Sequence, residues 1–196
     1  MKDLKRFCSF LIVAILFTSC TKTKDFYTIQ GEAQGSTYSI KYISTEEKVT
    51  KNQIDSLLTA FDLSLSTYRP DSKISKINAG DSTVVLDDFF TKTFQLSNQI
   101  YKETNGLFDP TIGVLVNAYG FGPNKKHQDL AQKQVDSLLQ FVGFDKIKLN
   151  KNKTITKKHK ETFIDFNAIA QGYSVDVVVS YLKSKGVENA IVEIGG

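Results

Sequence analysis

An abrupt change of hydrophobic pattern between residues 162 and 182 constrains the fold most. Thr162, Phe163 and Ile164 have the composition of a strand end, and apolar residues then recur at helical spacing. These later residues are Val175, Val178, Val179 and Leu182. A carboxylate, an amide, two alanines and a glycine lie between the two patterns. The sequence therefore predicts a tight strand-to-helix turn with polar groups at its mouth.

Strand and helix signals follow one another irregularly along the rest of the chain. Strands are expected near 26–31, 37–44, 84–86, 146–149, 154–156, 162–166 and 190–194. Helices are expected after caps at Thr50 and Asp87, and near 114–118, 129–142 and 170–185. Because this order is not a regular β-α-β array, we predict an α+β fold with mixed helices and a mainly antiparallel sheet. The 196 residues suffice for one sizeable domain or for part of a larger one.

The N-terminus has the build of an export signal. A positively charged start precedes an apolar run over 7–17, which is too short to span a bilayer as a helix. Small residues ending in Cys20 follow, and this arrangement resembles a bacterial lipoprotein signal. We therefore expect a signal peptide over 1–19, a lipid on Cys20 and a polar tether over 20–25. The protein would be exported and lipid-anchored to a bacterial membrane, facing the periplasm. The alternative is a cleaved signal in which the cysteine is incidental.

Composition excludes several functional classes. The only other cysteine, Cys8, lies within the expected signal, so no internal disulfide or cysteine nucleophile is predicted. His127 and His159 lie in lysine-flanked segments without metal-ligand spacing. The net charge of +4 indicates no nucleic-acid-binding surface, and a group of lysines is expected on a solvated hairpin. These are Lys151, Lys153, Lys157, Lys158 and Lys160. No serine-hydrolase, zinc-protease or Gly-rich nucleotide-binding pattern is present.

The first candidate site is the Pro-containing stretch TYRP, residues 67–70. Tyr68, beside Arg69, is of a type that stacks on planar ligands such as nucleobases and flavins. The structural alternative is that Tyr68 packs on its own loop while Asp71 caps the following helical turn.

The second candidate site is GLFDP, residues 106–110. Asp109 is held extended by the proline that follows, and Pro110 suits the first position of a helix. Asp109 is therefore either a helix N-cap or, with the backbone from Leu107 onward, a group that holds the edge of a ligand.

The third candidate site is the strand-to-helix turn that begins at Asp165. Carboxylate and carbonyl oxygens from Asp165, Asn167 and Ala168 suit a hard cation such as Mg²⁺, and Gly172 permits close approach. The N-terminus of the following helix favours phosphate, so a diphosphate with Mg²⁺ would satisfy both features. A capped turn, with Asp165 accepting from backbone N–H groups, is the structural alternative.

Six stretches in order resemble one family. They are G-E-A-Q-G-S-T-Y-S-I, L-S-T-Y-R-P-D-S-K-I-S-K-I-N, G-L-F-D-P-T-I-G-V-L-V-N, Y-G-F-G-P, D-F-N-A-I-A-Q-G-Y-S-V-D and V-E-I-G-G. Residues 27–196 are thereby similar to the ApbE family of FAD:protein FMN transferases, which are often exported lipoproteins. The resemblance implies an ApbE-like, T-fold-like domain, of which 26–196 would be the N-terminal part, incomplete at its C-terminus.

The resemblance also implies a reaction and its site. Such enzymes bind FAD with Mg²⁺, transfer FMN to a Thr or Ser hydroxyl of an acceptor protein and release AMP. The acceptor, a subunit of a membrane redox complex, would carry an Asp-x-x-Ser/Thr-Gly-Ala-Ser/Thr motif. By motif position, the residues that would contact FAD are Gln34, Tyr68, Leu107, Phe108, Asp109, Asp165 and Gln171. The backbone carbonyl of Ala168 would bind Mg²⁺, and the catalytic residues are expected beyond residue 196.

Two positions depart from the family pattern. Gln34 stands where methionine is frequent, and Gln171 stands where lysine or glutamate is common, so a charge near the cofactor is lost. This leaves two alternatives to the transferase. One is a periplasmic lipoprotein that binds FAD or hydrolyses it to FMN and AMP, and the other is a cell-envelope lipoprotein without flavin.

Overall fold

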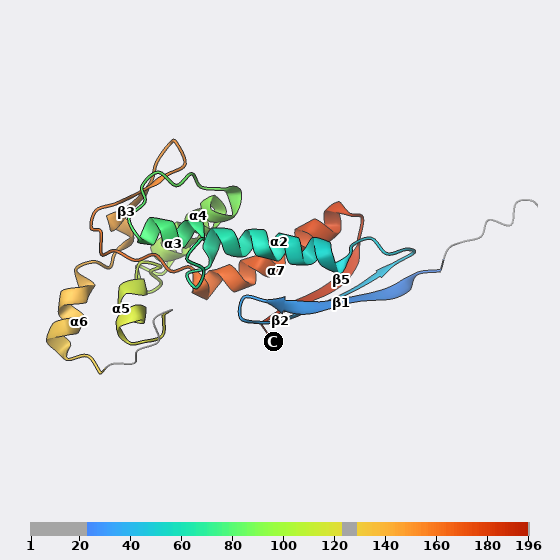
Figure 1. Ribbon diagram of the computed structural model, residues 1–196, viewed down its shortest axis with the longest axis horizontal. Helices are drawn as coiled ribbons and strands as arrows, with labels where there is room; N and C mark the ends of the chain where they lie inside the picture. The colour runs from blue at the N-terminus through green and yellow to red at the C-terminus, as the bar shows by residue number, and fades with distance from the viewer. Residues whose placement is uncertain (1–22, 123–128, 196) are drawn as a thin grey trace, which may run out of the picture.

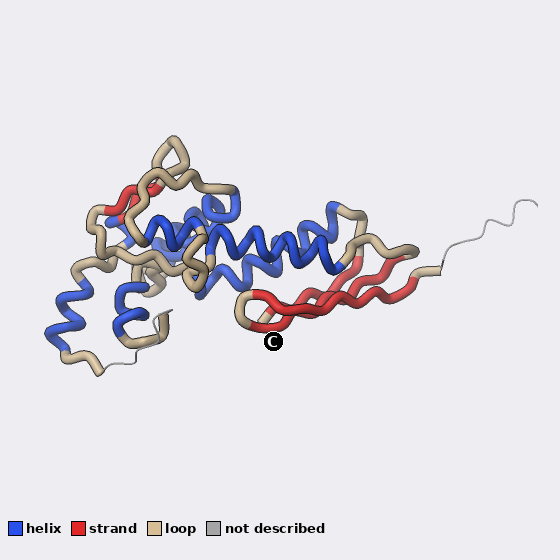
Figure 2. Tube along the Cα trace, viewed as in Figure 1, coloured by secondary structure: helices blue, strands red, loops and turns tan. Residues whose placement is uncertain are grey.

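The chain folds around two helices that lie side by side, with a sheet against one end of them (Figure 1). A computed structural model describes residues 23–122 and 129–195. The three longer strands lie along one half of these helices and extend past their ends, and the other elements lie toward the opposite end (Figure 2). The two helices are α2 (Lys51–Leu65) and α7 (Asn167–Ser184).

The larger sheet has three antiparallel strands in the order β1-β2-β5. β1 (Asp25–Ala33) and β2 (Ser36–Ser44) form a hairpin, and β5 (Asn189–Ile194) pairs with the other edge of β2. Gln34 and Gly35 connect the hairpin, with φ values of 56° and 75°. Positive φ at both residues is what a two-residue hairpin turn of matching twist requires. This turn brings Gln34 toward the helices.

One face of this sheet packs on α2 and α7. Alternate side chains of the strands face the helices, because the side-chain period of a strand is two. This first core contains Ile29, Tyr38, Ile40, Tyr42, Val49, Ile54, Leu58, Val178, Leu182, Val187 and Ile194. Tyr38 donates its hydroxyl to Asp55 Oδ1 of α2 at 2.6 Å, which fixes the helix against the sheet.

A second core lies under the other end of α2 and α7. It is formed with α3 (Lys73–Asn78), α4 (Asp88–Glu103), the 3-10 helix η1 (Phe144–Lys146) and the hairpin of β3 (Ile147–Leu149) and β4 (Ile155–Lys157). Aromatic rings fill it, and the Phe90 and Phe166 rings meet edge to face at 5.4 Å between centroids. Phe166 directly precedes α7, so this ring anchors the N-terminus of that helix.

Two short helices complete the described chain. α5 (Gly113–Ala118) and α6 (Gln132–Leu139) pack on each other, and α6 has no buried residue. In the described ranges, no helix is long and apolar enough to cross a membrane. The expected signal peptide over 1–19, Cys20 and His127 lie outside the described residues.

Most predicted elements and the fold class are confirmed. The structure is α+β with antiparallel sheets, and Thr50 and Asp87 occupy the N-cap positions of α2 and α4. Asp87 accepts from Phe90 N–H at 2.9 Å. The predicted helix over 129–142 is shorter, because only its middle has helical geometry. The predicted helix over 170–185 starts three residues earlier, at Asn167.

Two predicted strands are wrong. Residues 84–86 form no ladder, and Leu86 N–H makes a single bond to the Lys153 carbonyl at 2.8 Å. Residues 162–166 form only an isolated parallel bridge between Ile112 and Phe163. Both segments are apolar because they cover the second core, and neither has a neighbouring strand to pair with.

The prediction that the lysines of this hairpin are solvated is wrong at one position. Lys157 is half-buried, and its ammonium donates to the carbonyls of Asn78 (3.0 Å), Lys160 (3.0 Å) and Thr162 (2.9 Å). Burial lowers the pKa of Lys157. This lysine therefore holds backbone together, whereas Lys151, Lys153, Lys158 and Lys160 are exposed as expected.

Candidate functional site

A cavity of about 630 Å³ lies where the β1–β2 turn meets α2 and the first turns of α7. The polar residues that line this central pocket are Gln34, Asp62, Ser66, Tyr68, Arg69, Asn167 and Gln171. Phe61, Leu65 and Ala170 supply apolar wall. The fold thus brings together three residues that the sequence placed at the flavin site, namely Gln34, Tyr68 and Gln171, from three separate segments.

The Gln34 side chain leaves a polar group free in the wall of the central pocket. Its Nε2 is buried and has no hydrogen-bond partner among the described residues. Ser174 Oγ donates to the Gln171 carbonyl at 2.6 Å and lies 3.3 Å from Gln34 Oε1. An unpaired buried donor is costly, so the pocket fits a ligand that offers an acceptor.

Gln171 packs against the end of β5. A Cβ added at Gly195 would lie 2.0 Å from Gln171 Nε2, and the φ of Gly195 is +96°. The backbone conformation therefore favours glycine at this position, whereas the exposed amide of Gln171 could turn aside for a Cβ. The Gln171 side chain thus lies beside the end of β5, at the central pocket that it lines.

The TYRP stretch forms the opposite wall. Tyr68 is 54% exposed, and its hydroxyl donates to the Phe121 carbonyl at 3.3 Å. Arg69 makes a two-pronged ion pair with Asp71, at 3.1 and 2.8 Å. The expected cap at Asp71 is wrong, since Ser72 caps α3 by accepting from Ser75 N–H at 3.1 Å. Tyr68 is thus an exposed aromatic face beside a guanidinium, which suits a planar ligand that carries phosphate.

Asp62 is a polar residue of the pocket that the sequence reasoning missed. Burial raises its pKa, while the charge of Arg69 and the backbone of Gln34 oppose the shift. Asp62 follows Leu58 by four positions and precedes Leu65 by three, so helical spacing places it on the buried stripe of α2. The sequence signal that could have identified Asp62 was a carboxylate on the apolar stripe of a predicted helix.

The turn before α7 is held by single hydrogen bonds rather than by a strand. The Asn78 side chain donates to the Ile164 carbonyl and accepts from Ile164 N–H, each at 2.8 Å. Asp165 N–H donates to the Pro110 carbonyl at 2.7 Å. The Asp165 carboxylate accepts from Asn167 N–H at 2.8 Å, and burial raises the pKa of Asp165. The structure therefore contains the capped turn that was the alternative to a ligand site. The second oxygen of the Asp165 carboxylate still has lone pairs available for a ligand.

The GLFDP stretch lies beside this turn rather than in the lining of the central pocket. Leu107 is 94% exposed, and Phe108 and Asp109 are half-buried. Asp109 Oδ1 accepts from the N–H and hydroxyl of Thr111, at 2.8 and 2.6 Å. The alternative that Asp109 caps a helix is wrong, because Ile112 holds the N-cap position of α5. Asp109 instead closes the bend that presents the Pro110 carbonyl to Asp165.

The residues around Ala168 are those predicted to bind Mg²⁺. Ala168 is exposed in the first turn of α7, and nothing lies within 4 Å of the space beside Gly172. Among the residues that the structure describes, no group of three or more acidic, His or Cys side chains could hold a metal. Mg²⁺ commonly takes one or two protein oxygens and completes its six ligands with substrate phosphates and water. The Ala168 carbonyl and the Asp165 carboxylate offer oxygens of the type that this mode uses.

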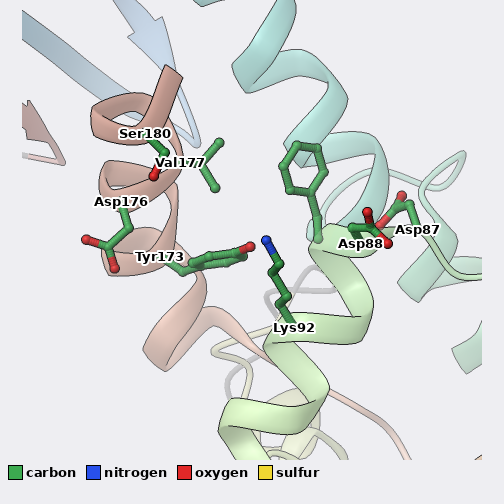
Figure 3. Close-up of a pocket in the computed structure, with 8 residues that line it drawn as sticks. Asp87, Asp88, Lys92, Tyr173, Asp176, Val177 and Ser180 are labelled. Carbon is green, nitrogen blue, oxygen red and sulfur yellow. The ribbon is translucent and has the colours of Figure 1, made fainter. Parts of the chain in front are cut away.

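A second cavity, of about 520 Å³, lies between α4 and α7 and contains none of the predicted site residues. Figure 3 shows that Tyr173 of α7 and Lys92 of α4 point toward each other across it. The Phe61 ring, which lines the central pocket, contacts Tyr173 at 5.7 Å between centroids and so lies between the two cavities. We take the central pocket as the candidate site, because it combines the predicted residues with an unpaired buried donor.

Comparison with known proteins decides the family. The family model of ApbE matches residues 34–196, which include the hairpin turn, the central pocket and β5. The chain belongs to the ApbE family. Its relatives include the FAD:protein FMN transferases of Vibrio cholerae and Haemophilus influenzae, 34% and 32% identical over 93% and 94% of this chain.

Solved ApbE structures share the fold. The flavin transferase ApbE of Vibrio cholerae superposes with a TM-score of 0.81 at 32% identity, covering 89% of this chain and 58% of that one. The apo flavinyl transferase ApbE of Pseudomonas stutzeri gives 0.80 at 28% identity, covering 88% and 57%. The chain spans 56% and 57% of the lengths of the Vibrio and Haemophilus relatives.

Proposed function

We propose that this ApbE-family protein transfers the FMN moiety of FAD to a Thr or Ser hydroxyl of an acceptor protein and releases AMP. The observation that carries the proposal is the central pocket, where Gln34, Tyr68 and Gln171 meet around an unpaired buried amide donor. The names of the Vibrio and Haemophilus relatives support the same reaction.

The residues of the central pocket have separate tasks in this proposal. The exposed Tyr68 ring would lie against the flavin, and Gln34 Nε2 would donate to a flavin or ribityl acceptor. Arg69 and the N-terminus of α7 would attract the diphosphate, since a guanidinium and free helix N–H groups favour anions. Leu107, Phe108 and Asp109 stay predicted contacts, and they would meet FAD only where it extends beyond the pocket lining.

The chemistry is a displacement at phosphorus. The acceptor hydroxyl oxygen forms a bond to the FMN phosphorus, the bond from that phosphorus to the bridging oxygen breaks, and AMP leaves with the electron pair. The hydroxyl proton passes to a base that we do not assign. Bound Mg²⁺ would neutralise charge on the phosphate oxygens. Within this chain, the Asp165 carboxylate and the Ala168 carbonyl would hold that cation, and catalysis is then mainly positioning and electrostatics.

The cellular setting is part of the proposal. The signal over 1–19 and a lipid on Cys20 would anchor the enzyme to a bacterial membrane, facing the periplasm. The acceptor would be a redox-complex subunit with an Asp-x-x-Ser/Thr-Gly-Ala-Ser/Thr motif.

The test uses the full-length protein with FAD, Mg²⁺ and an acceptor that carries this motif. We expect mass spectrometry to detect one FMN on the acceptor hydroxyl and AMP in solution, with no adduct when that hydroxyl residue is replaced by alanine. Omission of Mg²⁺ is expected to abolish the adduct. FMN and AMP released without an adduct would instead support the FAD-hydrolysing alternative, and neither product would refute both.

A further inference from the structure

The turn before α7 is fixed by an unusual device. A segment with strand-like composition would normally be aligned by a neighbouring strand, yet residues 162–166 have only one bridge, Ile112 to Phe163. In a hydrogen-bonded pair of an antiparallel sheet, each of two opposite residues donates its N–H to the carbonyl of the other. The Asn78 carboxamide makes this same pair of bonds with Ile164, donating and accepting at 2.8 Å each. One side chain therefore takes the place of a neighbouring strand.

Asn78 connects this turn to the opposite wall of the central pocket. It is the last residue of α3, and Ser72 is the N-cap of that helix. The Ser72 hydroxyl donates to the Ser66 carbonyl at 2.7 Å, so α3 is bonded to the loop that carries Tyr68 and Arg69. A continuous series of contacts thus runs from the loop through α3 to Asn78, and from there to Ile164, which has 0% exposure.

The contacts around Asn78 make the bond pair difficult to replace. The Asn78 backbone carbonyl accepts from Lys157 Nζ at 3.0 Å, and the same ammonium reaches the Thr162 carbonyl at 2.9 Å. Lys157 therefore braces both sides of the junction. Aspartate would keep the acceptor for Ile164 N–H but would turn an oxygen toward the Ile164 carbonyl, so only the carboxamide satisfies both groups.

We propose that Asn78 is a positioning residue of the flavin site, which fixes the Asp165–Ala168 turn relative to the Tyr68–Arg69 loop and so sets the width of the central pocket for FAD. The inference rests on the proposed function. Asn78 does not line the pocket. Its effect on FAD is transmitted through the position of Ile164, because Asp165 is the next residue in the sequence.

The test compares Asn78→Asp, Asn78→Ala and Lys157→Met with wild type in the full-length protein. FAD binding is followed by quenching of the flavin's own fluorescence. Asn52→Asp is the matched control, since it makes the same chemical change at an exposed residue of α2. We expect the Kd for FAD to rise about tenfold for both Asn78 variants, equivalent to about 1.4 kcal/mol. Lys157→Met should give a smaller rise, and the control should stay within about twofold of wild type.

Separate measurements distinguish positioning from a general loss of stability. Far-ultraviolet circular dichroism and the unfolding midpoint identify the temperature at which each variant is fully folded, and binding is measured there. With the acceptor assay, we expect the KM for FAD to rise more than kcat falls. Folded Asn78 variants with wild-type Kd and KM would overturn the inference, even if their midpoints fall. If Asn78→Ala does not fold, Asn78→Asp and Lys157→Met decide the question by the same criterion. A wild-type protein that binds no FAD would overturn the flavin function itself, and with it this inference.

Discussion

Replacing Gly113 with alanine tests whether the two segments beside the candidate site are packed as closely as the structure shows. A Cβ at this position would lie 2.5 Å from Phe163 Cδ1, 2.9 Å from the Phe163 carbonyl oxygen and 3.2 Å from Asp165 Cβ. The ring could turn aside, but the carbonyl oxygen belongs to the backbone. Accommodation therefore requires the segment around Gly113 to move away from the turn that contains Asp165.

The change in the free energy of unfolding caused by Gly113→Ala combines two opposing effects. One extra methyl group in a filled interior destabilises a protein by roughly 1–3 kcal/mol. Alanine also restricts the unfolded chain, which returns about 0.4–1 kcal/mol where the native backbone tolerates it. The net loss in the free energy of unfolding should be about 1–2 kcal/mol. At about 2–4 °C per kcal/mol for a chain of this size, the midpoint should fall by roughly 2–8 °C.

The assay is thermal unfolding of the full-length, FAD-free protein, with Gly172→Ala as the matched control. Gly172 is an exposed residue of α7, and an added Cβ would meet nothing within 4 Å. The same substitution there should stabilise the protein by about 0.5–1 kcal/mol, because alanine is the better helix former. A Gly113→Ala variant with a midpoint at or above that of wild type would refute the close packing.

Two further variants test electrostatics and capping. Burial raises the pKa of Asp165, so its stabilising contribution is complete below the unfolded-state pKa and is lost as pH rises through the folded-state value. Asp165→Asn should therefore raise the urea midpoint of the FAD-free protein more at about pH 7 than at about pH 4, and an equal effect at both pH values would contradict the argument. Asp87→Ala should cost about 1–2 kcal/mol in thermal unfolding, since the Asp87 carboxylate accepts from Phe90 N–H and the Ser64 hydroxyl. Asp88→Ala should change stability by less than about 0.5 kcal/mol, because that side chain is 83% exposed, and similar losses for both would show that the cap is not the cause.

Local chemistry made most of the elements predictable. Thr50 and Asp87 indicated where their helices begin, because capping depends on a few adjacent residues. The strand expected over 37–44 is present, and its alternate residues Tyr38, Ile40 and Tyr42 are all buried. The strands predicted at 84–86 and 162–166 failed because apolar composition reports burial, whereas a strand also needs a neighbouring strand to pair with.

The candidate site was predictable only in part. Gln34, Tyr68 and Gln171 lie around one cavity, but their convergence depends on how α2, α7 and the hairpin pack, which no local pattern encodes. The same holds for Asp62, whose position on the apolar stripe was visible but whose pocket was not. Asn78 carried no sequence signal for its role, because its partner Ile164 is 86 positions away.

That separation has a consequence for the order in which the molecule folds. The Asn78–Ile164 contact and the bond from Asn167 Nδ2 to Thr67 Oγ1 close loops of 86 and 100 positions. The β1–β2 hairpin, α2 and α4 need only neighbouring residues and can form early, whereas long loops must be closed at an entropic cost before their contacts stabilise anything. The walls of the central pocket therefore meet late, after the chain through α7 has been synthesised. A ligand that bridges those walls would act on the final step of folding and would retard its reversal.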